Sequence, residues 1–90
     1  MNRAERIRSA IESAIEPDSL EVTDESHLHA GHAGAQPGGE THYEVTVVSS
    51  RFSGQSRVAR QRSVYALLGT EFSSGLHALS VRALTPEEVS

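Results

Sequence analysis

The chain has 90 residues, a formal net charge of −4 and no cysteine. This length supports a modest core, so we expect one domain over residues 1–90 without a deep enclosed pocket. The lack of cysteine excludes disulfides, thiolate catalysis and the usual anchoring of an iron–sulfur cluster by the chain alone. No apolar run approaches the roughly 20 residues that cross a membrane. The charged N-terminus is unlike a secretory or transit signal, so we expect a cytoplasmic protein without membrane attachment.

The first quarter of the chain predicts a helix followed by a short strand. Ile7, Ile11 and Ile15 recur at helical spacing, which predicts a helix over residues 2–15. Pro17 ends this helix, because the residue before a proline avoids the α region. Residues 20–23 then alternate between apolar and polar side chains, as in a strand.

A glycine-rich loop over residues 24–40 contains His27, His29 and His32. Loops longer than about 12–15 residues are uncommon in compact domains and are often functional. The spacing of the three histidines could bring two or three imidazoles to one metal ion. The loop lacks the four fixed ligands of a structural zinc site, and a solvated loop that binds nothing is the alternative interpretation.

Residues 41–49 read as a second strand, with Tyr43, Val45 and Val47 on one face and with His42 among the residues on the other. A turn over residues 51–54 leads into a second helix over residues 56–72. The apolar stripe of this helix is expected to include Val58, Tyr65, Leu68 and Phe72, and to be widened by Val64 and Leu67.

Residues 76–84 read as a third strand, and a short last helix begins after Thr85 with Pro86 at its first position. His77 opens this strand on the side of Leu79 and Val81. A histidine at the edge of the core is one interpretation, and a side chain that reaches an incoming ligand is the other.

The element order α-β-β-α-β-α predicts an α+β fold. Strands joined without a helix should pair antiparallel, whereas strands joined through a helix should pair parallel. The result is a mixed three-stranded sheet with both long helices on one face.

A basic stretch follows the second strand, with Arg51, Arg57, Arg60 and Arg62 and no acidic residue before Thr70. Arginine makes planar contacts with phosphates and carboxylates, so this stretch predicts either a partner surface or a solvated helix face. Motifs for a nucleophile turn, a phosphate loop or a dinucleotide site are absent, so we do not expect an enzyme.

Several motifs occur in an order that strongly resembles the BolA family over nearly the whole chain. They are Asp-Glu-Ser-His, His-Ala-Gly-His, Gly-Glu-Thr-His-Tyr, Val-Val-Ser-Ser-Arg-Phe-Ser-Gly, Arg-Gln-Arg-Ser-Val-Tyr and Leu-His-Ala-Leu-Ser. The resemblance implies a fold similar to the class II KH domain. It also implies a partnership with a monothiol glutaredoxin around a shared 2Fe–2S cluster, in iron–sulfur trafficking or iron and redox regulation.

The resemblance also assigns the ligands. The C-terminal ligand histidine of the family falls on His77, and the loop ligand aligns best with His29, with His32 as the near alternative. The glutaredoxin would bring the sulfur, including that of its bound glutathione. The isolated chain would then be a monomer without a cofactor. His42 also matches a family position, where strand alternation suggests a structural or surface role.

Some members of the family are linked to DNA binding and transcription, which gives the alternative function for the basic stretch. Gly54-Gln55-Ser56-Arg57 lacks the second glycine with which a KH domain grips a single strand. Gln61 also departs from the histidine usual in the family, which puts in doubt any role assigned to that histidine. We therefore expect DNA binding, if present, to be weak and mostly electrostatic.

Overall fold

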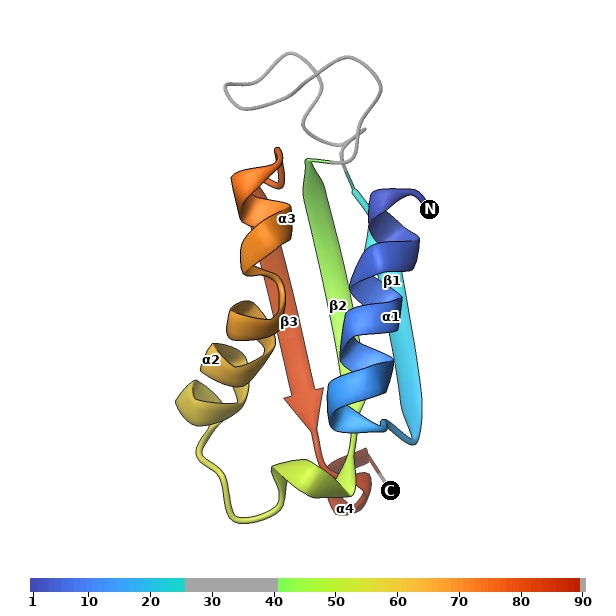
Figure 1. The fold of residues 1–90 in the computed structure, drawn as a ribbon. Coiled ribbons are helices and arrows are strands. Elements are labelled where there is room, and N and C mark those ends of the chain that lie inside the picture. Colours follow the sequence, from blue (N-terminus) through green and yellow to red (C-terminus); the bar gives the residue numbers. More distant parts are fainter. Residues whose placement is uncertain (26–40, 90) are drawn as a thin grey trace.

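The computed structural model describes residues 1–25 and 41–89, which form a sheet covered by helices (Figure 1). The elements of these residues, in chain order, are α1 (Arg3–Ile15), β1 (Ser19–Asp24), β2 (His42–Val48), a 3₁₀ turn (Ser50–Phe52), α2 (Arg57–Leu67), α3 (Gly69–Ser73), β3 (Ala78–Leu84) and α4 (Pro86–Val89). No helix within residues 1–25 and 41–89 is long and apolar enough to cross a bilayer.

The sheet has the strand order β1-β2-β3, with β2 in the centre. β1 pairs with β2 antiparallel, and Val22 lies opposite Val45. β2 pairs with β3 parallel, and Val45 lies opposite Val81. The mixed three-stranded sheet and the α+β class predicted from the sequence are confirmed.

The core lies between one face of the sheet and the two long helices. The three isoleucines of α1 are buried, and so are the apolar residues that alternate along β2 and β3. The members of this core are Ile7, Ile11, Ile15, Tyr43, Val45, Val47, Phe52, Val64, Leu68, Leu76, Leu79, Val81 and Ala83. Because these strand residues all point to one side, both helices cover the same face of the sheet (Figure 1).

Local chemistry sets both ends of α1. The side chain of Asn2 accepts a hydrogen bond from the backbone of Glu5, and the Glu5 carboxylate accepts one from the backbone of Asn2. This capping box satisfies two of the free N–H groups at the start of the helix. At the other end Glu16 adopts a left-handed conformation with a φ of 50° before Pro17. The predicted helix therefore forms with nearly the predicted bounds.

The single helix predicted over residues 56–72 is two helices, and that prediction is corrected. The break falls at Leu68, whose backbone has a φ of −111° and a ψ of 17°. The N–H of Leu68 donates to Tyr65 three residues earlier, which tightens the end of α2. Gly69, a poor helix former, then begins α3.

The predicted apolar stripe of α2 is also partly wrong. Val58 is 58% exposed and Tyr65 is 37% exposed, whereas Val64 and Leu68 are fully buried. The buried face of α2 also includes Arg60, whose guanidinium reaches the carbonyl oxygens of Gln55 and Ala83. With α2 in this orientation Val58 faces outward, and Tyr65 lies at the edge of β3, where its hydroxyl donates to the carbonyl oxygen of Leu79.

Candidate functional site

His77 lies directly before β3 and is exposed. Its backbone N–H donates to the carbonyl oxygen of Thr41 at 2.8 Å, and the N–H of Ala78 donates to the same oxygen at 3.1 Å. The preceding residue, Leu76, is buried in the core. The backbone of His77 is thus anchored while its imidazole is accessible, so the core-edge interpretation of this residue is wrong.

His42 is the first residue of β2 and lies beside His77. The centroids of the two imidazole rings are 5.3 Å apart, and the ring planes are inclined by 53°. Two imidazoles on one tetrahedral metal ion have centroids about 5 Å apart when each metal–nitrogen bond is about 2.0–2.1 Å. The histidine pair, His42 and His77, therefore has a spacing that suits a shared ion.

Thr41 holds the ring of His42. Its hydroxyl oxygen lies 2.9 Å from Nδ1 of His42, and His42 itself is 7% exposed. In the tautomer that carries its proton on Nδ1, the ring donates to this hydroxyl and Nε2 is left as the ligating nitrogen; in the other tautomer the hydroxyl donates to Nδ1. The burial of His42 agrees with the structural role expected for it, and its ring also lies next to that of His77.

Strand alternation is the reason that sequence reasoning missed this pairing, because it placed His42 on the face opposite Tyr43 but His77 on the side of Leu79 and Val81. His42 lies opposite Ala78 in the sheet, so the residues just before β2 and β3 lie side by side. Aligning the starts of the two strands predicted over residues 41–49 and 76–84 would have placed both histidines at one end of the sheet. In Figure 1 this end also holds α3 and the first turn of α1.

The loop histidines His29 and His32 fall within residues 26–40, outside the described part of the chain. Both stay predictions as metal ligands. Within residues 1–25 and 41–89, no group of three or more His, Asp or Glu side chains is placed to hold one metal ion.

The basic stretch does not form one cationic surface. Arg60 is 6% exposed and donates to Gln55, Ala83 and Glu88, with its guanidinium over the ring of Phe52. A buried guanidinium with these partners is a structural group, so Arg60 is not available to a phosphate.

The other three arginines of the stretch are exposed. Arg51 forms an ion pair with Glu16. Arg57 and Arg62 are also exposed, and the described residues show no acidic partner for either of them. Of the four predicted residues, Arg60 is thus withdrawn from the surface, whereas Arg51, Arg57 and Arg62 stay exposed, with Arg51 beside the carboxylate of Glu16.

Gln61 points its side chain toward the sheet. Its amide nitrogen donates to the carbonyl oxygen of Val81 at 3.2 Å. This contact gives the glutamine a structural role on the free edge of β3, away from the histidine pair.

Two carboxylates are held ionised by arginines. The hydrogen bond from Arg60, followed by that from the backbone of Thr85, lowers the pKa of Glu88 from its usual 4.5 to about 2. For Glu71, the hydrogen bond from Arg6 and the nearby charges lower the pKa, and burial opposes this effect. These carboxylates stabilise the fold and lie outside the histidine pair.

Residues 11–88 match the family model described as BolA-like protein. The chain belongs to the BolA family. The structure of the BolA domain of SufE1 from Arabidopsis thaliana superposes with a TM-score of 0.87 at 48% identity, covering 98% of this chain and 96% of that chain. BolA1 from Arabidopsis thaliana superposes with a TM-score of 0.86 at 42% identity and the same coverage. The observed fold is thus that of solved BolA proteins, and a KH-like description is compatible with it.

Two curated BolA-family relatives come from the same plant. SufE-like protein 1, chloroplastic/mitochondrial, is 49% identical over 98% of this chain, and protein BOLA1, chloroplastic, is 46% identical over 97%. The chain spans 25% of the length of the first and 56% of the second. The family match begins at Ile11, so the first two turns of α1 lie before it.

Proposed function

We propose that this BolA-family chain is a non-enzymatic adaptor that shares a 2Fe–2S cluster with a monothiol glutaredoxin, in iron–sulfur trafficking or iron sensing. The observation that carries the proposal is the histidine pair: an exposed imidazole at His77 beside a nearly buried one at His42. Both belong to a BolA domain, and both lie where two parallel strands begin.

The donor chemistry supports a shared cluster. Clusters of this kind are held mainly by cysteine thiolates, and the chain has none. Two histidines do serve on one iron of a 2Fe–2S centre in Rieske proteins, where the thiolates hold the other iron. Imidazoles from this chain and thiolates from a glutaredoxin with its glutathione make a complementary set.

His77 is the first ligand of the proposal, because its backbone is anchored and its side chain is accessible. The second ligand comes from His29 or His32 of the loop, as the family resemblance implies, or from His42. His42 would ligate in the tautomer whose Nδ1–H donates to the hydroxyl of Thr41.

The decisive experiment mixes this chain with a cluster-loaded monothiol glutaredoxin. We expect the visible absorption and circular dichroism of the cluster to change on mixing, with one chain bound per glutaredoxin. The loaded glutaredoxin alone gives the reference spectrum, and Arg8→Met is the control because Arg8 is an exposed residue of α1. An unchanged spectrum at excess of this chain would contradict the proposal.

DNA binding is the weaker candidate. Only Arg57 and Arg62 of the basic stretch offer exposed guanidiniums without an acidic partner in the described residues. Phosphate contacts supply most non-specific affinity for DNA, so two arginines on an acidic chain support only weak binding.

A further inference from the structure

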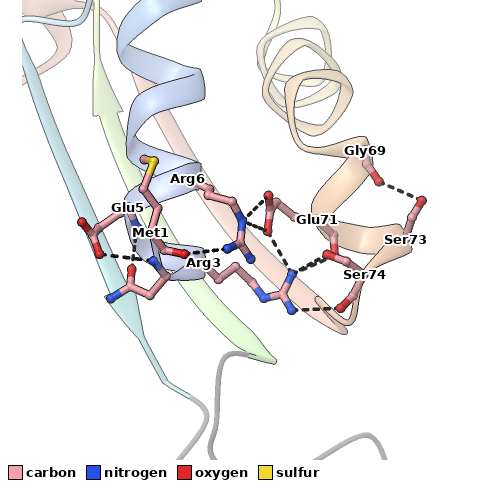
Figure 2. Close-up of polar contacts among 9 residues, drawn as sticks. Met1, Arg3, Glu5, Arg6, Gly69, Glu71, Ser73 and Ser74 are labelled. Atoms are coloured by element: carbon pink, nitrogen blue, oxygen red, sulfur yellow. Dashed lines mark hydrogen bonds and ion pairs between the residues drawn. The ribbon is translucent and has the colours of Figure 1, made fainter.

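A buried ionic cluster joins the first turn of α1 to the end of α3 (Figure 2). Nη1 of Arg3 donates to the backbone oxygen of Glu71 at 3.0 Å, to its carboxylate at 2.9 Å and to the hydroxyl of Ser74 at 3.0 Å. Nη2 of Arg3 donates to the backbone oxygen of Ser74 at 3.1 Å. Arg3 and Glu71 are 8% and 7% exposed, although they lie at opposite ends of the sequence.

Arg6 adds a second guanidinium to the same carboxylate. Its Nε lies 3.0 Å and 3.2 Å from the two carboxylate oxygens of Glu71, and its Nη1 donates to the backbone oxygen of Met1. Burying charged groups costs desolvation energy, so a buried pair is weak evidence for stability. A set of four hydrogen bonds from one arginine to two residues instead specifies a conformation.

The conformation specified is that of the turn before His77. The backbone oxygen of Glu71 also accepts from the N–H groups of Ser74 and Leu76. Gly75 has a φ of 126°, and a Cβ there would lie 3.0 Å from Nη2 of Arg3. Arg3 therefore packs against the one residue of the turn that must be glycine.

His77 follows Gly75 by two residues, and its backbone N–H donates to the carbonyl oxygen of Thr41, next to β2. The turn is thus held between α1 and β2. Without Arg3, the backbone oxygens of Glu71 and Ser74 lose a donor and the turn gains freedom. The His77 imidazole extends from this turn.

We propose that Arg3 is a positioning residue for His77, supported by Arg6 through their common partner Glu71. We call the hydrogen-bonded group of Arg3, Arg6, Glu71 and Ser74 the clamp. It holds His77 in place before a partner arrives, which lowers the entropy lost on binding. This inference rests on the proposed function of His77 as a cluster ligand. It assigns a role at the site to Arg3 and Arg6 of α1, which are distant from His77 in the sequence.

The test compares Arg3→Met with wild type by amide hydrogen exchange of the free chain. The N–H of His77 reports on the clamped turn. The N–H of Ser49, which donates to Leu84 at the opposite end of β2 and β3, is the internal reference. Loss of a charged hydrogen-bond network should accelerate exchange at His77 at least about tenfold more than at Ser49. Equal acceleration at both sites would show a merely structural role and would overturn the proposal.

A second readout is the histidine pair itself. In Arg3→Met the ring resonances of His77 should shift and its contact with His42 should weaken, whereas Arg8→Met should leave both unchanged. If Arg3→Met does not fold, Ser74→Ala removes one of the four acceptors of Arg3, together with the hydrogen bond that the Ser74 hydroxyl donates to the backbone oxygen of Glu71. It should give smaller changes of the same kind. Unchanged exchange and ring resonances in a folded Ser74→Ala would then overturn the proposal.

Measuring cluster formation with the glutaredoxin distinguishes a failure of this inference from a failure of the proposed function. A wild-type chain that forms no mixed cluster refutes the function, while the exchange data still decide on the clamp. A wild-type chain that forms the cluster should do so with at least about tenfold weaker affinity once Arg3 is replaced by Met. Equal affinity of the two would refute the clamp alone.

Discussion

The side-chain amide of Gln61 donates a hydrogen bond to the carbonyl oxygen of Val81, across the free edge of the sheet. Tyr65, one turn later in α2, donates from its hydroxyl to Leu79, and Arg60 donates to Ala83. Backbone groups of alternate strand residues point to the same edge. Three side chains of α2 therefore cap three successive outward carbonyls of β3. Exposed strand edges invite pairing with other chains, so these caps protect the edge.

Removing the caps should weaken the fold and expose the edge. Each lost hydrogen bond costs about 0.5–1.5 kcal/mol, so Gln61→Ala combined with Tyr65→Phe should lower the free energy of unfolding by about 1–3 kcal/mol. Urea denaturation measures this loss, and light scattering after gel filtration should show concentration-dependent dimers. Ser63→Ala is the control, because Ser63 is exposed and bonds only within α2. A monomeric double variant as stable as wild type would contradict the capping role.

The cluster ligands should differ in their sensitivity to mutation. His77→Ala should abolish the spectrum of the mixed cluster, since the anchored and exposed imidazole is lost. His29→Ala should weaken or alter the spectrum, because His32 can substitute for it in part. His42→Ala is the new comparison: a loss as large as that of His77→Ala would make His42 the second ligand. A wild-type spectrum for His77→Ala would refute its assignment.

The free chain should hold no iron–sulfur cluster after purification or chemical reconstitution. It offers imidazoles and carboxylates and no thiolate, a poor donor set for a sulfide-bridged pair of irons. Iron and sulfide assays together with visible absorption check this expectation. A brown monomer with stoichiometric iron and sulfide would contradict the shared cluster.

Stability should fall in acid because of Glu88 and Glu71, whose pKa values are both lowered in the fold. A carboxyl with a lowered pKa adds stability above its unfolded pKa and loses it as the pH falls through the folded pKa. We therefore expect a stable plateau near neutral pH and a decline from about 4.5 towards about 2 for Glu88. Urea denaturation at a series of pH values measures the curve. Glu88→Gln should flatten it, and an unchanged slope in that variant would show that Glu88 does not contribute.

Affinity for DNA should be low and strongly dependent on salt. Each phosphate contact on a single strand contributes about −0.7 to the slope of log affinity against log salt, so Arg57 and Arg62 together account for about −1.4. Replacing both by Ala should remove this part of the slope in a fluorescence titration with an oligonucleotide. Arg60→Ala is unsuitable for this test, because it removes a buried guanidinium and should lower stability by about 2–4 kcal/mol. A slope that the double variant leaves unchanged would rule out these two contacts.

Local sequence patterns determined most of the architecture. The spacing of Ile7, Ile11 and Ile15 predicted α1, and the alternation of Tyr43, Val45 and Val47 predicted β2 with its core face. The element order then implied one antiparallel and one parallel pairing, which the sheet has. These features depend on periodicity and connection type, which neighbouring residues encode.

The orientation of α2 could not be read from its own residues. Val58 and Tyr65 are as apolar as a core stripe requires, yet both are exposed. Arg60 decides the rotation through acceptors on Ala83 and Glu88, and Tyr65 instead caps the edge of β3. These partners are distant in the sequence, so a pattern within the helix cannot reveal them.

The sequence by itself determined the residue types of the site: histidines, no cysteine, and His77 next to a glycine turn. Only the tertiary structure decided which of the described groups meet. The parallel register brings His42 to His77, and the fold brings Arg3 of α1 to Glu71 of α3. The physical reason is that strand register and helix packing are set by the burial of the whole core. Side chains far apart in the chain then become neighbours, although nothing in their local sequence indicates it.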